Sequence, residues 1–407
     1  MMNPQEITEN FAKLVEYYRV KKGISQNQLA EESGVSASLL SRINKGTRKA
    51  PTLDKVYNIA KALDIPLNQL FEEEGSQVSK HGSKKEFIFT LFLKKFPEII
   101  ENVIGHSIEG IKTEVNYGSK YIDFYAVNRE KKIEIFVENQ IKPSDRSDHL
   151  KGKITPIINS ISEGYLIWIA AKFQKSHIDE VKQLLRDNPQ KYINFYAVEI
   201  NEEVLNNIDY LNTIYELDVW NNLDIINKIE EKVRLVDCHI QMPQTHMGKA
   251  YVGDYEYDFK RDDDIKEFLS VQLCEKLPFF LNFHTQKKHL MNDRILKFGA
   301  GVGEVTYFCS AFDKKQRAIV GIRFEYSKQD WYQYFKQNEK LLKKYICPDI
   351  YFDDENRIIS HSIKSSREII PEIVDYISEV FRRFILFFSP YTYGGKLKLL
   401  PIRTNLA

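Results

Sequence analysis

The most constraining feature of the chain is a pair of short helices joined by a glycine turn near its N-terminus. Ser25 and Gln28 form a capping-box pattern, in which a serine caps a helix and a glutamine three residues later bonds back to it. Gly34 stands where a left-handed residue ends a helix, and Ser36 caps a second helix. The apolar residues of this second helix recur at helical spacing: Leu39, Leu40 and Ile43. Such a pair of helices predicts a compact all-α unit.

The residues of this segment resemble those of the phage-repressor-like (XRE) helix-turn-helix domains. The resemblance covers nearly all of residues 7–71 and rests on two runs, Ile24-Ser25-Gln26-x-x-Leu29-Ala30-x-x-Ser33-Gly34-Val35-Ser36 and Leu40-x-x-Ile43-x-x-Gly46. It implies an all-α domain, taken as residues 1–75, that binds double-stranded DNA. The second helix of such a domain lies in the major groove.

The resemblance also implies which residues contact DNA. They are Gln26, Ser36, Ala37, Ser38, Arg42, Lys45, Arg48 and Lys49. Ala37, Ser38 and Arg42 would face base edges, and the loop through Lys49 would contact the backbone. Residues 42–49 hold four positive charges and no acid, which suits phosphate contacts, and arginine reads guanine through two hydrogen bonds. The alternative is a helical interaction module that has lost DNA binding.

The 407-residue chain is long enough for two further domains. Lys and Arg number 58 against 57 Asp and Glu, so any affinity for nucleic acid must come from local patches. Apolar runs are too short to span a membrane, and the N-terminus has no signal pattern. The four cysteines show no Cys-x-x-Cys pairing, which favours reduced thiols. We therefore expect a cytoplasmic protein that does not enter membranes.

A linker over residues 76–85, rich in Ser, Gly and Lys, precedes an expected α/β domain over residues 86–200. A helical pattern over 84–100 begins it, and strand-like and helix-like runs follow. The expected strands are Ile111–Tyr117, Tyr121–Val127, Ile133–Asn139, Tyr165–Ala171 and Tyr192–Ile200, and the expected helices are Ser144–Ile161 and His177–Leu185. This order predicts a central mixed sheet.

Charged residues occupy two neighbouring strands of this sheet at positions where apolar residues are expected. Asp123 lies between two apolar residues of the second strand. In the third strand, the period of two places Glu134, Glu138 and Gln140 on one face and aliphatic residues on the other. Acids from neighbouring strands that converge at one end of a sheet can hold a hard divalent cation and leave room for water and phosphate.

This pattern resembles the PD-(D/E)XK nuclease superfamily, in which an aspartate begins the motif and Glu-x-Lys closes it on the next strand. The closing element here is Glu138-Asn139-Gln140, as in a group of prokaryotic nuclease-like proteins in which a segment like Asp145–Leu150 follows. The resemblance covers residues 84–200 and implies a restriction-endonuclease-like fold. By that resemblance, Asp123 and Glu138 would bind Mg²⁺ or Mn²⁺, and Gln140 would replace the lysine that orients or polarises the attacking water.

Several features of this site stay open at the level of sequence. Glu114 is a possible extra ligand, and Lys151 or Lys153 on the following helix would supply the positive charge that glutamine lacks. Three alternatives to a nuclease remain: a retained fold used only for binding, surface acids on a sheet edge, and a protein-interaction platform.

The C-terminal part predicts a connector over residues 201–258 and an α+β domain over residues 259–407. Its expected elements are a helix at Asp264–Leu277, a hairpin around Asp313–Gln316 with its second strand at Arg317–Tyr326, and a final amphipathic helix at Pro371–Phe387. The region resembles a C-terminal domain of unknown function often found behind such nuclease-like domains, a resemblance that adds no chemistry.

Two further patterns in the chain predict structure rather than chemistry. Gly299-x-Gly301-x-Gly303 precedes a strand-like run rather than a helix, so it predicts a turn instead of a phosphate loop. The nine histidines show no metal-ligand spacing, and we expect His149 and His284 at the surface or in packing.

The sequence thus predicts a multidomain DNA-binding protein with a metal-dependent nuclease-like core, acting in restriction or anti-phage defence. The alternative is a non-enzymatic transcriptional regulator. We expect a homodimer, because such domains bind paired half-sites and cleavage of both DNA strands needs two active sites.

Overall fold

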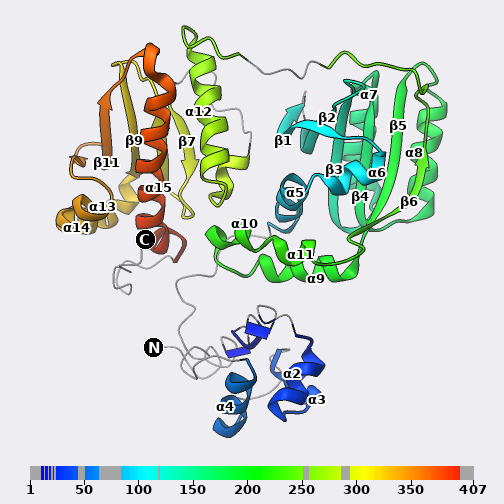
Figure 1. The fold of residues 1–407 in the computed structure, drawn as a ribbon, viewed down its shortest axis with the longest axis horizontal. Coiled ribbons are helices and arrows are strands. Elements are labelled where there is room, and N and C mark those ends of the chain that lie inside the picture. The colour runs from blue at the N-terminus through cyan, green and yellow to red at the C-terminus, as the bar shows by residue number, and fades with distance from the viewer. Residues whose placement is uncertain are drawn as a thin grey trace. The chain divides into compact units, whose positions relative to one another are not determined.

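The computed structural model describes residues 11–12, 14–16, 18–19, 22, 24–44, 51–63, 84–117, 120–250, 256–285 and 294–394 (Figure 1). The chain divides into two compact units, Met1–Val78 and Ser79–Ala407. No helix among these residues combines the length and the apolar character that crossing a membrane requires.

The N-terminal unit contains the two helices that the sequence predicts. Ser25 caps α2 (Gln26–Ser33), and the reciprocal hydrogen bonds of the capping box to Gln28 are both present. Gly34 ends this helix with a φ of 62°, a left-handed conformation that glycine adopts without strain. The helices α3 (Ala37–Asn44) and α4 (Leu53–Ala62) follow. Their apolar faces share one core, which includes Leu29, Leu40, Ile43, Val56 and Ile59.

A six-stranded mixed sheet forms the first part of the second unit. Its strands are β1 (Ile108–Tyr117), β2 (Lys120–Asn128), β3 (Glu134–Pro143), β4 (Glu163–Lys172), β5 (Tyr192–Ile200) and β6 (Val233–His239), and they lie in this order across the sheet. The pairs β1–β2, β2–β3 and β5–β6 are antiparallel. The pairs β3–β4 and β4–β5 are parallel.

Helices pack against this sheet and continue beyond it. They are α5 (Lys85–Lys95), α6 (Glu98–Ile104), the π-helix η3 (Arg146–Ile154), α7 (Thr155–Ser160), α8 (Lys175–Arg186), α9 (Glu202–Leu211), η4 (Glu216–Asp218), α10 (Val219–Asn222) and α11 (Asp224–Asn227). α5 contacts β1, β2 and β3. Apolar residues of η3, α7 and α8 form a separate core with β4 and β5, centred on the buried Trp168.

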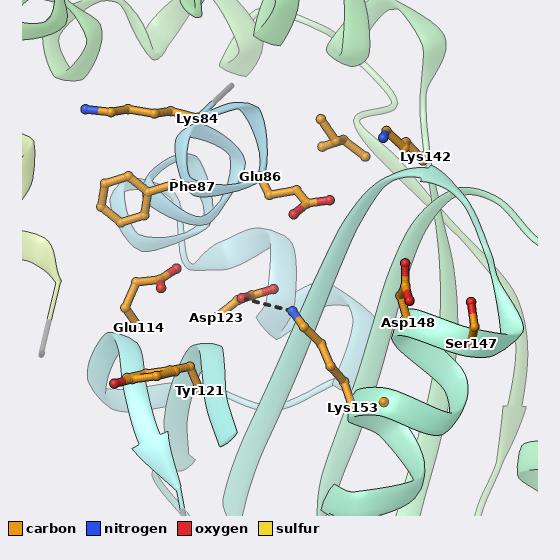
Figure 2. Close-up of a pocket in the computed structure, with 12 residues that line it drawn as sticks. Lys84, Glu86, Phe87, Glu114, Tyr121, Asp123, Lys142, Ser147, Asp148 and Lys153 are labelled. Atoms are coloured by element: carbon orange, nitrogen blue, oxygen red, sulfur yellow. Dashed lines mark ion pairs between the residues drawn. The ribbon is translucent and has the colours of Figure 1, made fainter. Parts of the chain in front are cut away.

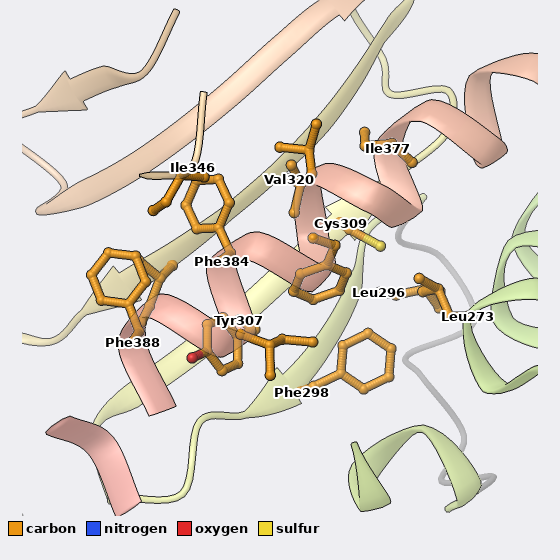
Figure 3. Packing of buried hydrophobic residues seen from close by; sticks show 14 of the residues in the cluster. Leu273, Leu296, Phe298, Tyr307, Cys309, Val320, Ile346, Ile377, Phe384 and Phe388 are labelled. Carbon is orange, nitrogen blue, oxygen red and sulfur yellow. The ribbon is translucent and has the colours of Figure 1, made fainter. Parts of the chain in front are cut away.

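The rest of the unit is built on a five-stranded antiparallel sheet. Its strands are β7 (Leu296–Gly299), β8 (Val305–Ser310), β9 (Arg317–Phe324), β10 (Tyr351–Asp353) and β11 (Ile358–Lys364), in the order β10-β11-β9-β8-β7. Its helices are α12 (Asp262–Lys276), η5 (Leu281–His284), η6 (Tyr326–Lys328), α13 (Gln329–Gln337), α14 (Glu339–Tyr345), η7 (Arg367–Ile369) and α15 (Ile370–Gly394). One face of the sheet packs against α15, where Phe384 and Phe388 join Tyr307 and Val320 in the core (Figure 3).

The structure differs from the predicted elements at several places, three of which concern the first sheet and its helices. The segment 201–258, predicted to be a connector, supplies β6, the sixth strand of the first sheet, so this prediction is wrong for that strand. The polar helix predicted over Ser144–Ile161 is two helices, because η3 ends at Ile154 and Pro156 lies in the first turn of α7. The helix predicted over residues 84–100 is likewise two helices, α5 and α6, which are separated at Phe96 and Pro97, and the second extends to Ile104.

The glycine motif before β8 serves packing and turn geometry. Gly301 has a φ of 94°, and a Cβ at this position would lie 2.7 Å from ring atoms of Tyr393. Gly301 therefore allows both a positive φ and the close approach of this ring, which agrees with the turn predicted from the sequence.

Candidate functional site

The predicted DNA-contacting residues that the structure describes lie at the start of α2, at the cap of α3 and on α3 itself. Ala37, Ser38 and Arg42 are exposed, and the Arg42 Nε donates a hydrogen bond to the Ser38 carbonyl at 3.2 Å. The Ser36 hydroxyl accepts a hydrogen bond from the backbone N–H of Leu39 at 3.2 Å and thus caps α3. Gln26 begins α2. Three of the predicted contacts lie outside the described residues: Lys45, Arg48 and Lys49.

The second group of predicted residues comes together at one end of the mixed sheet. Asp123 of β2 is 9% exposed and Glu138 of β3 is 0% exposed. The backbone N–H of Asn139 donates to Asp123 Oδ2 at 2.8 Å, which ties the two strands together at this point. Two acids of neighbouring strands therefore lie beside each other in a largely buried environment.

Lys153 of η3 brings a positive charge to both acids. Its ammonium group forms an ion pair with Glu138 and lies 3.7 Å from Asp123 Oδ1. Burial raises the pKa of the Asp123 carboxyl, although Lys153, the Asn139 N–H and His149 act in the opposite direction. The alternative lysine, Lys151, is exposed and does not line the pocket described below.

Gln140 contacts the loop before η3 rather than the two acids. Its Nε2 donates to the Pro143 carbonyl at 2.8 Å and to Asp145 Oδ2 at 2.6 Å. Asp145 in turn caps η3 by accepting from the backbone N–H groups of Asp148 at 2.7 Å and His149 at 3.1 Å. Burial raises the pKa of Asp145, but these hydrogen bonds and His149 outweigh it, so that the pKa is lowered.

Polar atoms without partners surround this arrangement. Within the described residues, Glu138 Oε2 and Gln140 Oε1 are buried and have no hydrogen-bond partner. His149 Nε2 is also buried and has no hydrogen-bond partner. His149 Nδ1 lies 2.7 Å from Asp145 Oδ2, to which it donates because Asp145 is an ionised acceptor. Buried acceptors that lack donors are costly unless a cation or water meets them.

The donor set at the strand ends fits an oxygen-liganded divalent cation with an incomplete shell. Asp123 and Glu138 offer carboxylate oxygens, one of them the unpartnered Glu138 Oε2. The described residues contain no group of three or more His, Cys, Asp or Glu side chains arranged to hold a metal ion. The two carboxylates would therefore leave most of the coordination shell to water and substrate oxygens.

A pocket of about 850 Å³ opens over Asp123 and Lys153, and the buried Glu138 lies beneath its lining (Figure 2). It is lined by Lys84, Glu86, Phe87, Glu114, Tyr121, Asp123, Ile141, Lys142, Ser147, Asp148, Gly152 and Lys153. Figure 2 shows Phe87, Glu114 and Tyr121 on one side of Asp123, and Lys142 and Ser147 on the other. The pocket thus joins acids, lysines and aromatic rings around one carboxylate.

Glu114 occupies a strained position in this pocket. Thr113 pairs with Phe124 and Val115 with Ile122, so Glu114 is the residue of β1 opposite Asp123. Its φ of 53° is left-handed, a conformation that a non-glycine residue adopts at a cost. This conformation occurs at a position that brings a carboxylate to the pocket lining.

Several residues of the site carry little signal in the sequence. Asn139 Nδ2 donates to the Thr90 hydroxyl at 2.9 Å, which fixes α5 to β3. Thr90 was detectable as the one polar residue within the buried run Ile88–Leu93. Glu86 and Tyr121 gave no such signal, because exposed acids and tyrosines are common on any helix or strand.

The two histidines singled out in the sequence have structural partners. His149 is held by Asp145, as described above. His284 is 2% exposed, and its Nε2 donates to the Pro278 carbonyl at 2.8 Å. Burial and the nearby Lys94 lower the pKa of His284 to about 3, so the ring is neutral. This agrees with its predicted role in packing.

Comparison with known proteins identifies the N-terminal segment. Residues 15–70 match the family model described as Helix-turn-helix. Together with the capped helices α2 and α3, this match confirms the predicted XRE-type helix-turn-helix domain.

Similar proteins include three Bacillus subtilis (strain 168) regulators. The HTH-type transcriptional regulator SlrR is 36% identical over 74 residues, which are 18% of this chain and 49% of SlrR. The HTH-type transcriptional repressor RghR is 33% identical over 79 residues, covering 19% of this chain and 58% of RghR. The HTH-type transcriptional regulator SinR is 32% identical over 60 residues, covering 15% of this chain and 54% of SinR. The chain spans about half the length of the curated relatives it matches.

A solved structure is also similar to this chain. The high-resolution crystal structure of the restriction-modification controller protein C.AhdI from Aeromonas hydrophila is 33% identical, covers 16% of this chain and 96% of its own, and has a TM-score of 0.15.

Proposed function

We propose that this protein binds double-stranded DNA through its helix-turn-helix domain and hydrolyses phosphodiester bonds at Asp123, Glu138 and Lys153. The observation that carries the proposal is the ion pair of Lys153 with the buried Glu138, next to Asp123, in which Lys153 and Asp123 also line a pocket. A cation and two acids at one sheet end are the groups that a restriction-endonuclease-like site requires. A role in restriction or anti-phage defence is part of the same proposal.

Asp123 and Glu138 would hold Mg²⁺ or Mn²⁺ through their carboxylate oxygens. When bound, such a cation lowers the pKa of a coordinated water and offsets the charge of the phosphate. Bringing the two acids together also costs repulsion, which a divalent cation relieves.

Lys153 would take the part that the sequence motif assigned to position 140. Its ammonium would donate to the scissile phosphate and offset the charge that develops there. Gln140 then acts as a positioning residue, because it holds Asp145, which caps the helix that carries Lys153. Positive charge thus reaches the site from η3 rather than from β3.

The test combines thermal unfolding with DNA cleavage by the full chain. Mg²⁺ or Mn²⁺ should stabilise the wild type and support nicking or cleavage, and Asp123→Asn and Glu138→Gln should lose both responses while staying folded. The expected loss of cleavage is at least about 100-fold, since the site contributes several kcal/mol.

Two lysine variants complete this experiment. Lys153→Met should lose cleavage, whereas Lys151→Met, an exposed lysine of the same helix, should retain it. The absence of any metal response, with unchanged unfolding midpoints in both carboxylate variants, would remove the nuclease proposal.

A second candidate is a non-enzymatic transcriptional regulator in which the same fold only binds a ligand or DNA. The names of the similar proteins SlrR, RghR and SinR favour it. It predicts metal-dependent stabilisation without cleavage of any DNA or RNA substrate.

Under either candidate function we propose that the protein is a homodimer. Light scattering at micromolar concentration, with and without DNA, tests this, and a monomeric mass would contradict it.

A further inference from the structure

The pocket at the candidate site carries two aromatic side chains that neither hydrolysis nor metal binding uses. Tyr121 of β2 is 50% exposed, and Phe87 of α5 is partly buried and lines the same pocket. A single exposed tyrosine is common on a protein surface. What sets Tyr121 and Phe87 apart is that both line the pocket that contains Asp123.

The position of Tyr121 relative to Asp123 is fixed by strand β2. It lies two residues before Asp123 on β2, so both side chains leave the same face of the strand, roughly 7 Å apart along it. Figure 2 shows the Tyr121 ring beside the pocket on the Glu114 side of Asp123. The separation is on the scale of one nucleotide of an extended strand.

The pocket lining carries four acids, Glu86, Glu114, Asp123 and Asp148, and three lysines, Lys84, Lys142 and Lys153. A phosphate at this site therefore needs the divalent cation proposed at Asp123 together with the lysines beside it. Lys142, exposed at the end of β3, and Lys153 both line the pocket, and Figure 2 shows Lys142 across from Tyr121. A phosphate held between these lysines would leave its neighbouring base near the ring. Aromatic rings beside positive charge are the features that bind single strands, because every base has a face that stacks.

We propose that the substrate of this site is single-stranded DNA, with an unpaired base stacked on Tyr121. This inference rests on the proposed function, which places a phosphate of the substrate beside Asp123. Stacking selects an unpaired base, since both faces of a base inside a duplex are covered by its neighbours. The helix-turn-helix domain would bring the chain to duplex DNA, and the pocket would accept a locally opened or displaced strand.

The experiment measures binding of the full chain to a fluorescently labelled single-stranded oligodeoxynucleotide by anisotropy, with Ca²⁺, a hard oxygen-liganded cation, in place of Mg²⁺. A gel run after each titration checks that the oligodeoxynucleotide is still intact. Tyr121→Ala should weaken binding about 5- to 150-fold, the range expected when one stacked base is lost. Tyr121→Phe keeps the ring and should bind like the wild type. Tyr351→Ala removes another exposed tyrosine, on β10, and should change nothing.

The inference is overturned if Tyr121→Ala binds the single strand as tightly as the wild type, or if it weakens duplex binding to the same extent. The outcome is separable from that of the proposed function. If binding of the single strand depends on the Tyr121 ring but no DNA is cleaved, the proposed hydrolysis is wrong and the proposed single-stranded ligand stands. If duplex DNA is cleaved and Tyr121→Ala does not change that cleavage, the proposed hydrolysis stands and the proposed single-stranded substrate is wrong.

Discussion

Helix α3 and the end of strand β3 both carry residues predicted to contact or cleave DNA, but these residues are exposed on α3 and buried on β3. On α3, Ala37, Ser38 and Arg42 are exposed, and the core lies on the opposite face. At the end of β3, Glu138, Asn139 and Gln140 are 0%, 0% and 2% exposed and bond to neighbouring elements. The first surface can change without cost to the fold, whereas the second is part of the fold.

The largest expected effect tests the buried side of this comparison. Lys153→Met leaves the Glu138 carboxylate buried without its cation. Because Lys153 itself is 32% exposed, the variant should lower the free energy of unfolding by about 3 kcal/mol, the low end of the range for buried pairs. Urea unfolding at neutral pH measures it, with Lys151→Met as the matched control expected within about 0.5 kcal/mol of wild type. The double variant Glu138→Gln, Lys153→Met should recover much of the loss. Equal stabilities of the two single lysine variants would contradict the buried pair.

The exposed side of the comparison predicts the reverse pattern. Arg42→Ala should weaken binding to a cognate duplex by about 1–3 kcal/mol through the loss of a base contact, and its unfolding free energy should stay within about 0.5 kcal/mol of wild type. Lys49→Ala should weaken binding to all sequences alike and reduce the salt dependence. Wild-type affinity in both variants, measured by anisotropy on specific and random duplexes, would reject the groove assignment.

Asp145 lies between the two extremes, because it is partly exposed yet caps η3. Asp145→Ala should cost about 1 kcal/mol, the usual worth of a helix cap. Its folded pKa is lowered, so its contribution is present above the unfolded value of 3.8 and is lost as the pH falls through the folded pKa. The difference between variant and wild type, followed by urea unfolding across this range, should therefore shrink in acid. A constant difference would argue against the charged cap.

The smallest effect concerns Asp123 and has an unusual sign. Its folded pKa is raised, so the stability that this group contributes is present below the unfolded value of 3.8 and is lost as the pH rises through the folded pKa. In EDTA at neutral pH, Asp123→Asn should therefore raise the unfolding midpoint slightly. Mg²⁺ should reverse the order by stabilising only the wild type, and a variant less stable than wild type in EDTA would contradict this.

The helix-turn-helix domain was predictable residue by residue because its signals are local. The Ser25 cap, the Gln28 return bond and the Gly34 turn involve residues at most a few positions apart. Periodicity likewise gave β5 as Tyr192–Ile200, since a buried strand bounded by polar residues has clear ends.

The candidate site was predictable only in part because its partners come from distant segments. The acids Asp123 and Glu138 stood out in apolar strands, but the choice between Lys151 and Lys153 depends on which side of η3 meets β3. Strand β6 was not predicted. It lies at a sheet edge and is mostly exposed, so its sequence has no continuous apolar run. The strained Glu114 arises from the β1–β2 register, which sequence alone does not give.

The wide turn of η3 has a consequence for how this protein can tolerate changes in length. Within η3, between the cap Asp145 and Ile154, one inserted or deleted residue would rotate everything after it by roughly 80–100° around the helix. Lys153 would then leave Glu138, while the composition of the helix stayed almost the same. Substitution of exposed residues here, such as Arg146 or Lys151, keeps that rotation unchanged. The segment should thus accept many replacements but no insertion or deletion, so its length matters more than the identity of most of its residues.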